Sequence, residues 1–216
     1  QAIRTDGLEG VGGALYNGPN ASPSIINCAF RGNRSLDGGA IMNRDSTPTV
    51  INSVFQGNRA LEEGGAIFTN ANGRTLDCIN CSFQGNLSDS RGGALYIFGS
   101  ATVQLINCII WNNRTSLAAT GQASSLSISG FSGSFTRIHS LVQYYGSDGT
   151  GNLNGNHAAN SPQFEAEVDP LSSPITGGSL RLLGGSPALG AGLNSANTQT
   201  TDIAGEPRIS GGLIDM

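Results

Sequence analysis

Three residues late in the chain have side chains that could carry acid–base chemistry on a sugar polymer. Arg137 and His139 lie two residues apart in a segment of alternating apolar residues, so we expect them on the same side of one strand, and Tyr144 or Tyr145 follows closely. Lysis of a uronate requires a base with a lowered pKa, and Arg and His can serve as such bases. Arg137, His139 and Tyr144 are therefore the candidate catalytic residues if the protein is a lyase or hydrolase of acidic polysaccharides.

Acidic residues recur once or twice per repeat, in front of each Gly-Gly-Ala motif. Asp37, Glu63 and Asp89 are examples, and Arg34 and Arg59 stand a few residues away from them. Opposite charges at this spacing usually form solvated ion pairs between coils. The alternative is a row of carboxylate oxygens that holds a structural Ca²⁺, with Asp37, Glu63 and Asp89 as ligands. We expect no other cofactor.

The four cysteines allow three interpretations. Cys28, Cys81 and Cys108 take the same place in successive repeats, and Cys78 falls in an aliphatic column, so the pattern favours buried free thiols. A bridge between Cys81 and Cys108 of neighbouring coils is the alternative. A zinc site needs four convergent ligands, and the two histidines lie far along the chain, which argues against a metal.

One residue in each Gly-Gly-Ala strand is aromatic or Met and could form a binding platform. If the preceding Leu or Ile faces the core, these side chains form an exposed row that could stack on an extended sugar or peptide. In the opposite register they lie inside, and both registers remain open. The residues, with Trp111 added by parity, are Tyr16, Met42, Phe68, Tyr96 and Trp111.

The elements that must position these residues follow from a repeat. Gly-Gly-Ala followed by Leu or Ile begins at residues 12, 38, 64 and 92, and a block that starts Ile-Asn recurs in step at residues 26, 51, 79 and 106. Apolar residues alternate within each block, as Ile26, Cys28 and Phe30 do, which predicts strands whose apolar columns are buried by stacking. A break in phase between Ile25 and Ile26 predicts a bend. About three short strands per repeat and no helix-length segment predict an all-β, right-handed parallel β-helix of about 26 residues per coil.

The repeat is strong over residues 12–115 and weak over residues 116–160, so we expect coils over residues 1–160. Residues 161–216 contain most of the prolines, and we expect a final coil there with an irregular cap over the open end of the stack, within the same domain. Asparagines that end each block predict a hydrogen-bonded ladder in which the Asn also adopts the left-handed conformation of the turn. They are Asn33, Asn58, Asn86 and Asn113.

Composition excludes several classes of function. Fifteen acidic and eleven basic residues give a net charge of -4, so nucleic acid is an unexpected partner. All basic residues are Arg, which excludes Schiff-base chemistry and a phosphate-loop lysine. No window holds the roughly 18 consecutive apolar residues that cross a bilayer, so membrane insertion is not expected. The start at Gln1 indicates an excised or mature piece, with neighbouring domains in a larger parent chain.

Two resemblances cover nearly the whole chain. Gly-Gly-Ala-Ile with Phe-x-x-Asn, as in Phe30 with Asn33, resembles the repeat of the chlamydial polymorphic outer membrane proteins. The strings at residues 149–153, 161–164, 179–182, 186–189 and 201–208 resemble the end of bacterial secreted β-helix proteins of the choice-of-anchor Q type, although Gly190 replaces the usual Asp. The resemblances imply a secreted or cell-surface bacterial protein, associated with the outer membrane and adhesin-like, and they carry over no active site.

The sequence as a whole predicts a non-enzymatic extracellular module that presents a rigid face to a glycan or a cell-surface protein. An enzyme that acts on acidic polysaccharides and a passive spacer are the alternatives.

Overall fold

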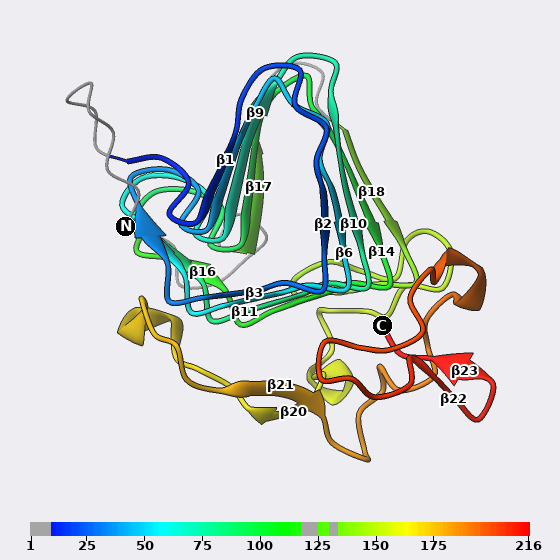
Figure 1. Ribbon diagram of the computed structural model, residues 1–216. Helices are drawn as coiled ribbons and strands as arrows, with labels where there is room; N and C mark the ends of the chain where they lie inside the picture. The colour runs from blue at the N-terminus through cyan, green and yellow to red at the C-terminus, as the bar shows by residue number, and fades with distance from the viewer. Residues whose placement is uncertain (1–9, 118–124, 130–133) are drawn as a thin grey trace.

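The structure is a computed structural model that describes residues 10–117, 125–129 and 134–216. The chain winds into a parallel β-solenoid, which confirms the predicted right-handed parallel β-helix. Each coil passes through four sheets, called A to D in chain order, and Figure 1 looks nearly along the stack. The sequence predicts three strands per coil, and the fourth is a two-residue strand too short to show alternation.

All strands within these four sheets pair in parallel with the next coil. Sheet A contains β1 (Leu15–Asn17), β5 (Ile41–Arg44), β9 (Ile67–Ala71), β13 (Leu95–Gly99) and β17 (Leu126–Ser129). Sheet B contains β2 (Ser24–Ile26), β6 (Thr49–Ile51), β10 (Thr75–Ile79), β14 (Thr102–Ile106) and β18 (Ser134–Ile138). Sheet C contains β3 (Ala29–Arg31), β7 (Val54–Gln56), β11 (Ser82–Gln84), β15 (Ile109–Trp111) and β19 (Leu141–Val142). Sheet D contains β4 (Arg34–Ser35), β8 (Arg59–Ala60), β12 (Leu87–Ser88) and β16 (Arg114–Thr115). Strands β17, β18 and β19, in the weak part of the repeat, pair in parallel with the preceding coil.

The bend between sheets B and C falls on an asparagine with a left-handed backbone. Asn27 has a φ of 55°, and Asn52, Asn80 and Asn107 repeat it with values of 50°, 54° and 53°. This residue reverses the phase of the alternation, so Ile26 leaves the coil on the outer face while Cys28 and Phe30 pack against the core. The sequence analysis treated Ile26, Cys28 and Phe30 as one inward run, which is wrong for Ile26.

Apolar columns fill the inside of the coils. Phe30, Phe55 and Phe83 stack face to face, with ring centroids 4.8 and 4.6 Å apart. This spacing equals the separation of paired strands, so each ring lies on the ring of the neighbouring coil. Ile41, Ile67 and Leu95 of sheet A and Val50 and Leu105 of sheet B face the same core.

The predicted asparagine ladder is confirmed. Asn58 accepts at Oδ1 from both the backbone N–H and the Nδ2 of Asn33, at 3.0 and 2.8 Å, and Asn86 and Asn113 repeat these bonds. The predicted conformation of these residues is wrong, because the residue in front of the ladder Asn takes the positive φ. That residue is Gly32, Gly57, Gly85 or Asn112.

The cysteines are free thiols, as the column pattern predicts. Cys81 and Cys108 each donate Sγ–H to the carbonyl oxygen two residues earlier, at 3.3 Å. Ser53 and Ser140 make the same bond with a hydroxyl at 2.9 Å. The column therefore accepts a small donor of either kind.

We expect the buried thiols to be unreactive in the folded protein. Burial raises the pKa of Cys78 and Cys108 well above that of a free thiol, so little thiolate forms, and the side chains are closed to reagents. Titration with a disulfide reagent should detect one accessible thiol, the half-buried Cys28, and all four after unfolding. Detection of two or more thiols in the native state would contradict this packing. Cys108→Ser, which copies Ser140, should fold normally.

The sequence predicts a final coil and a cap in the C-terminal segment. The four strands of this segment pair with one another in two antiparallel pairs, outside sheets A to D. The segment runs along the outer face of sheet C, below β3 and β11 in Figure 1. Gln84 binds the backbone of Val168 through both amide atoms, at 2.8 and 3.1 Å, and Ile175 donates its N–H to the carbonyl of Gly57. Its elements are η1 (Ala158–Asn160), β20 (Phe164–Ala166), η2 (Pro170–Ser172), β21 (Ser179–Leu182), η3 (Asn194–Ala196), β22 (Ile209–Ser210) and β23 (Leu213–Ile214).

The same segment then follows the asparagine bends between sheets B and C. Asn107 binds both backbone groups of Leu193, Asn80 donates to Asn197, and Asn52 donates to the carbonyl of Thr201. None of the three short helices among the described residues is long enough to span a membrane.

Candidate functional site

The three candidate catalytic residues are placed around the last coil with separate partners. Arg137 falls in register with the inward Leu105, its guanidinium lies 4.9 Å from the ring centroid of Tyr145, and it donates to the carbonyl of Gly146. His139 follows the end of β18 in the position of the bend asparagines, with a φ of 46°, and its Nδ1 lies 2.9 Å from the carbonyl oxygen of Ala191. Among these three described residues, no hydrogen bond, ion pair or ring contact joins any two.

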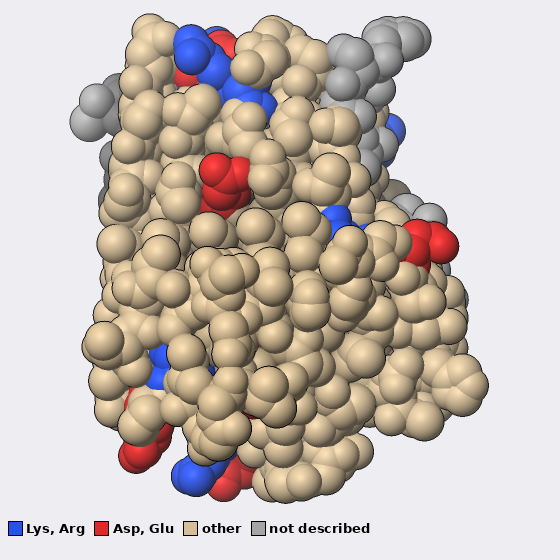
Figure 2. Space-filling model, turned by 90° about the vertical axis from the view of Figure 1, so that its right-hand side faces the viewer, with Lys and Arg blue, Asp and Glu red and all other residues tan. Residues whose placement is uncertain are grey.

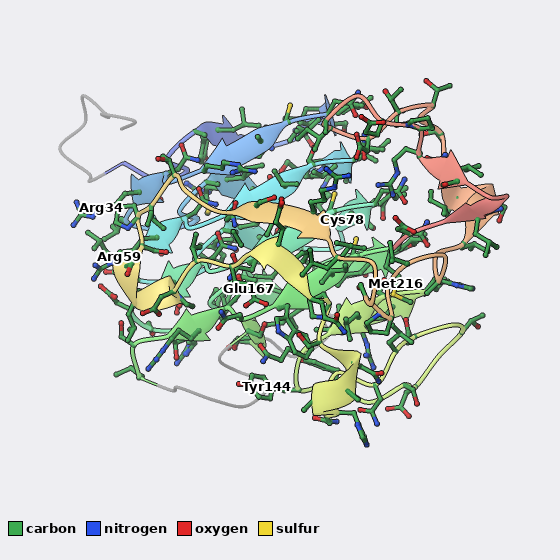
Figure 3. The ribbon with its side chains drawn as sticks, turned by 90° about the horizontal axis from the view of Figure 1, so that it is seen from below. Arg34, Arg59, Cys78, Tyr144, Glu167 and Met216 are labelled. Carbon is green, nitrogen blue, oxygen red and sulfur yellow. The ribbon has the colours of Figure 1, made fainter. Side chains whose placement is uncertain are left out.

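Arg137 therefore closes the end of the core. Burial lowers the pKa of its guanidinium, while Tyr145 and Asp148 oppose the shift. The expectation that Arg137 and His139 share one side of a strand is wrong, because β18 ends at Ile138 and the next residue turns the chain. Tyr144 is half-buried, and Figure 3 shows it among the loops beyond the last coil.

The expected exposed row on sheet A is largely covered. The parity is as predicted, since Met42, Phe68 and Tyr96 point away from the main core and form a small cluster of their own. Their exposed fractions are 6, 5 and 1%, however, and only Tyr16, at 39%, lies at the surface. The turns that lead from sheet D into sheet A explain this, because Arg91 of one turn donates to the Tyr96 hydroxyl and lies over its ring.

Trp111 also leaves the coil outward and is nevertheless buried. The C-terminal segment covers it, and it packs in a cluster that includes Phe164 and Met216 from that segment. The exposed platform predicted from Tyr16, Met42, Phe68, Tyr96 and Trp111 is therefore wrong for four of its five members. The alternation of apolar residues shows which side of a strand each residue faces, but it does not show which other segments cover that side.

Removal of the Tyr96 ring should destabilise the fold. Tyr96→Ala deletes a fully buried ring that contacts Phe68 at 5.0 Å, so we expect a loss of about 3 kcal/mol in the free energy of unfolding. Urea denaturation followed by circular dichroism would measure it. Phe98→Ala, two residues along the same strand and 44% exposed, is the control and should cost less than about 1 kcal/mol. Equal effects would show that the cluster is not buried.

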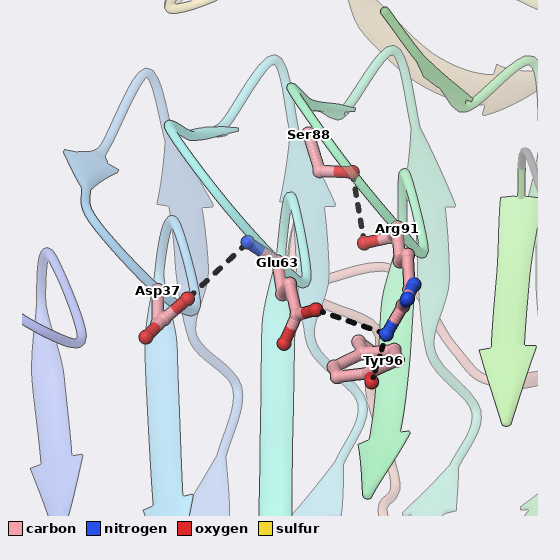
Figure 4. A network of polar contacts seen from close by, with 5 residues as sticks. All are labelled: Asp37, Glu63, Ser88, Arg91 and Tyr96. Carbon is pink, nitrogen blue, oxygen red and sulfur yellow. Dashed lines mark hydrogen bonds and ion pairs between the residues drawn. The ribbon is translucent and has the colours of Figure 1, made fainter. Parts of the chain in front are cut away.

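A polar network joins these turns across three coils, as Figure 4 shows. Asp37 accepts the backbone N–H of Glu63 at 3.2 Å, and Glu63 pairs with Arg91 at 3.5 Å. Burial raises the pKa of Asp37 and of Glu63, and repulsion by the Asp37 charge raises the pKa of Glu63 further, while the backbone N–H of Glu63 lowers that of Asp37. The stacked turns thus hold two neighbouring acids and a guanidinium. The sequence analysis places the two acids in front of their Gly-Gly-Ala strands, and it does not name Arg91.

Asp89, the third calcium candidate, pairs with Arg59 instead, at 3.1 Å. Figure 3 shows Arg34 and Arg59 side by side at one edge of the molecule, and their strands pair in register. No group of three or more metal-ligating side chains occurs among the described residues. The ion pairs predicted between coils occur for Asp89 and Glu63, and calcium in this row stays a prediction.

The outer face of sheet B is regular and bears in-register rows. One row is made of isoleucines, Ile26, Ile51, Ile79, Ile106 and Ile138, each paired with the next coil. All five are half-buried or exposed, and Ile26 is 40% exposed. Two residues before each isoleucine lies a second row of polar residues, which consists of Ser24, Thr49, Asp77, Gln104 and Thr136. Figure 2 looks onto this flank and shows few charges among many neutral side chains.

Sequence reasoning missed this face. The isoleucine row was assigned to the core because it begins the repeated block, and the predicted bend was placed before the isoleucine, whereas the chain bends at the asparagine that follows it. Its signal was present, since an Asn directly after the last apolar residue of a strand often takes a positive φ. Among the described residues, the outward side chains of sheet B are covered neither by the turns nor by most of the C-terminal segment.

The comparisons with known proteins concern the fold. A family model described as "Right handed beta helix region" matches residues 5–132. No curated protein and no solved structure matches the chain.

Proposed function

Because the chain belongs to the right-handed β-helix family, we propose that it is a non-enzymatic binding module that presents the outer face of sheet B to an extracellular glycan. The observation that carries this proposal is the pair of in-register rows on that face, one aliphatic and one polar. A stack of paired strands spaces such side chains about 4.8 Å apart on a rigid support.

The chemistry of the rows suits a sugar polymer. Isoleucine side chains offer an apolar strip to the C–H faces of sugar rings, and the neighbouring hydroxyl, amide and carboxylate groups can bind ring hydroxyls. The face needs no rearrangement to bind, because its backbone is fixed by hydrogen bonds on both sides of each inner strand.

The resemblance of the repeats and of the strings within residues 149–208 supports a proposed location. Both resemble those of secreted or surface-anchored bacterial proteins, so we propose an adhesin-like role at the cell surface, with a cell-surface protein as the other class of ligand.

Affinity electrophoresis through gels that contain plant, algal or bacterial polysaccharides tests the proposal. We expect retardation by at least one polymer, and loss of that retardation in a variant with Ile51, Ile79 and Ile106 changed to Thr. Thr keeps the β-branched shape and removes apolar surface. The control changes three exposed leucines elsewhere, Leu117, Leu171 and Leu183, to Thr.

Each other outcome points to a different function. Retardation with a shortened polymer would indicate an enzyme, and attention would return to Arg137 and His139. Retardation that both triple variants retain would place the site on another face. No retardation in any gel would overturn the glycan proposal in favour of a protein ligand or a spacer.

A further inference from the structure

We propose that Asp77 anchors the ligand on the outer face of sheet B, and that this ligand is a neutral, hydroxyl-rich glycan rather than an anionic polymer. The inference rests on the proposed function and adds the residue and the charge class that determine specificity.

Asp77 occupies the centre of the face. It lies on β10, the middle strand of sheet B, in register with Thr49 on one side and Gln104 on the other. Its Oδ1 atom is buried and has no hydrogen-bond partner within the described structure. A buried carboxylate oxygen without a hydrogen bond has lost hydration, and no protein donor replaces it. This raises the free energy of the folded protein unless a hydrogen-bond donor binds.

Asp77 is also the single charged residue among the outward positions of the described sheet B strands. The others are the isoleucine row and the neutral residues Ser24, Thr49, Thr75, Thr102, Gln104, Ser134 and Thr136. At the outward positions of these described strands an anionic polymer would meet a carboxylate and no guanidinium, since Arg74, directly before β10, donates to Asn20. Like charges raise the free energy of such a complex. A neutral glycan meets no such repulsion.

The hydroxyls of a sugar ring supply what Asp77 lacks. Because Oδ1 is closed to solvent, ring hydroxyls would donate to Oδ2 of the ionised carboxylate, and such charge-assisted bonds are stronger than neutral ones. The isoleucines on either side would contact the ring faces and exclude water from these bonds. The apolar row gives affinity for polymers in general, and Asp77 fixes the position of the ring.

Ionisation of Asp77 should control binding. Burial raises the pKa of Asp77, and no charged partner shifts it. Hydroxyl donors stabilise the ionised form, so affinity should fall as the pH falls through this raised pKa, above the usual 3.8 of an aspartate. No other titratable side chain lies on the described outer face of sheet B to mimic this dependence.

The test compares the wild-type protein with Asp77→Asn and with the control Asp148→Asn, which removes the same charge from an exposed loop. The probes are soluble neutral polymers, a β-glucan and a galactomannan, and two polyanions, polygalacturonate and alginate. We expect the wild type to bind a neutral polymer and Asp77→Asn to bind it about 10- to 100-fold more weakly. Asp148→Asn should bind as the wild type does, and the decline in affinity at acid pH should vanish in Asp77→Asn alone. Circular dichroism would show that all three proteins are folded.

The two proposals fail in different ways. A neutral polymer that binds wild type and Asp77→Asn equally would overturn the role of Asp77 and leave the glycan-binding function standing. Tighter binding of polygalacturonate or alginate than of the neutral polymers would overturn the charge class. Failure of every polymer to bind the wild type would overturn the proposed function itself.

Discussion

Gly65→Ala is expected to abolish the native fold. A Cβ atom on Gly65 would overlap the carbonyl oxygen of Gly93 in the next coil and lie 2.7 Å from the carbonyl carbon of Leu87. Both obstacles are backbone atoms in hydrogen-bonded strands or turns, so no side-chain rotation can relieve them. We expect a loss of more than about 4 kcal/mol, a size reserved for severe core disruption. Purified protein would show loss of the strand signal in circular dichroism, or the variant would be recovered only as aggregate.

Gly177→Ala is the matched control for this experiment. Gly177 is exposed, and a Cβ atom there would meet nothing within 4 Å. We therefore expect no loss and a gain of up to about 1 kcal/mol, because Ala restricts the unfolded chain. A Gly65→Ala protein as stable as Gly177→Ala would show that the coils are not stacked as closely as the structure places them.

Asn86→Ala is expected to have the next largest effect. Asn86 Oδ1 accepts from the backbone N–H and the Nδ2 of Asn58, and its Nδ2 donates to the carbonyl of Phe55 and to Asn113. Alanine would leave the buried N–H of Asn58 without an acceptor inside a closed ladder. Each buried unsatisfied group costs about 1–3 kcal/mol, so we expect a loss of about 3–5 kcal/mol in urea denaturation.

Asn33→Ala tests whether the stability comes from the stacked amides of the ladder or from an asparagine in its own turn. Asn33 is at the first rung and is half-buried, and it donates to Asn58 without accepting from an earlier coil in the described structure. Its loss should cost about 1 kcal/mol. If Asn33→Ala were as damaging as Asn86→Ala, the stability would come from the local turn and not from the stacked amides.

The sequence predicts those parts of the fold that a coil repeats identically. Gly64 and Gly65 recur because the turn needs a positive φ at the first and close approach of the next coil at the second. Phe55 and Asn86 recur because each stacks on its own kind one coil away. Because each coil repeats the one before it, a residue type that one coil needs recurs at a regular spacing in the sequence. That spacing can be recognised without a structure.

Parts of the structure that depend on covering segments could not be predicted in this way. Tyr96 and Ile79 both leave their strands outward, but a turn covers Tyr96 while Ile79 remains partly accessible. Trp111 is hidden by Phe164, 53 residues later in the chain, which follows no period. The candidate site changed for this reason from the aromatic row of sheet A to the isoleucine and Asp77 face of sheet B.

The path of the C-terminal segment has a consequence for how the protein unfolds. In a stack whose coils touch only their neighbours, the coils at either end can fray one at a time. Here Leu193, Asn197 and Thr201 bind three successive coils through Asn107, Asn80 and Asn52. A coil that opens therefore loses its bonds to this segment as well as those to its neighbours, which raises the free energy of local opening. The segment thus links coils that are not direct neighbours, so we expect these three coils to melt more cooperatively than a stack held by neighbour contacts alone.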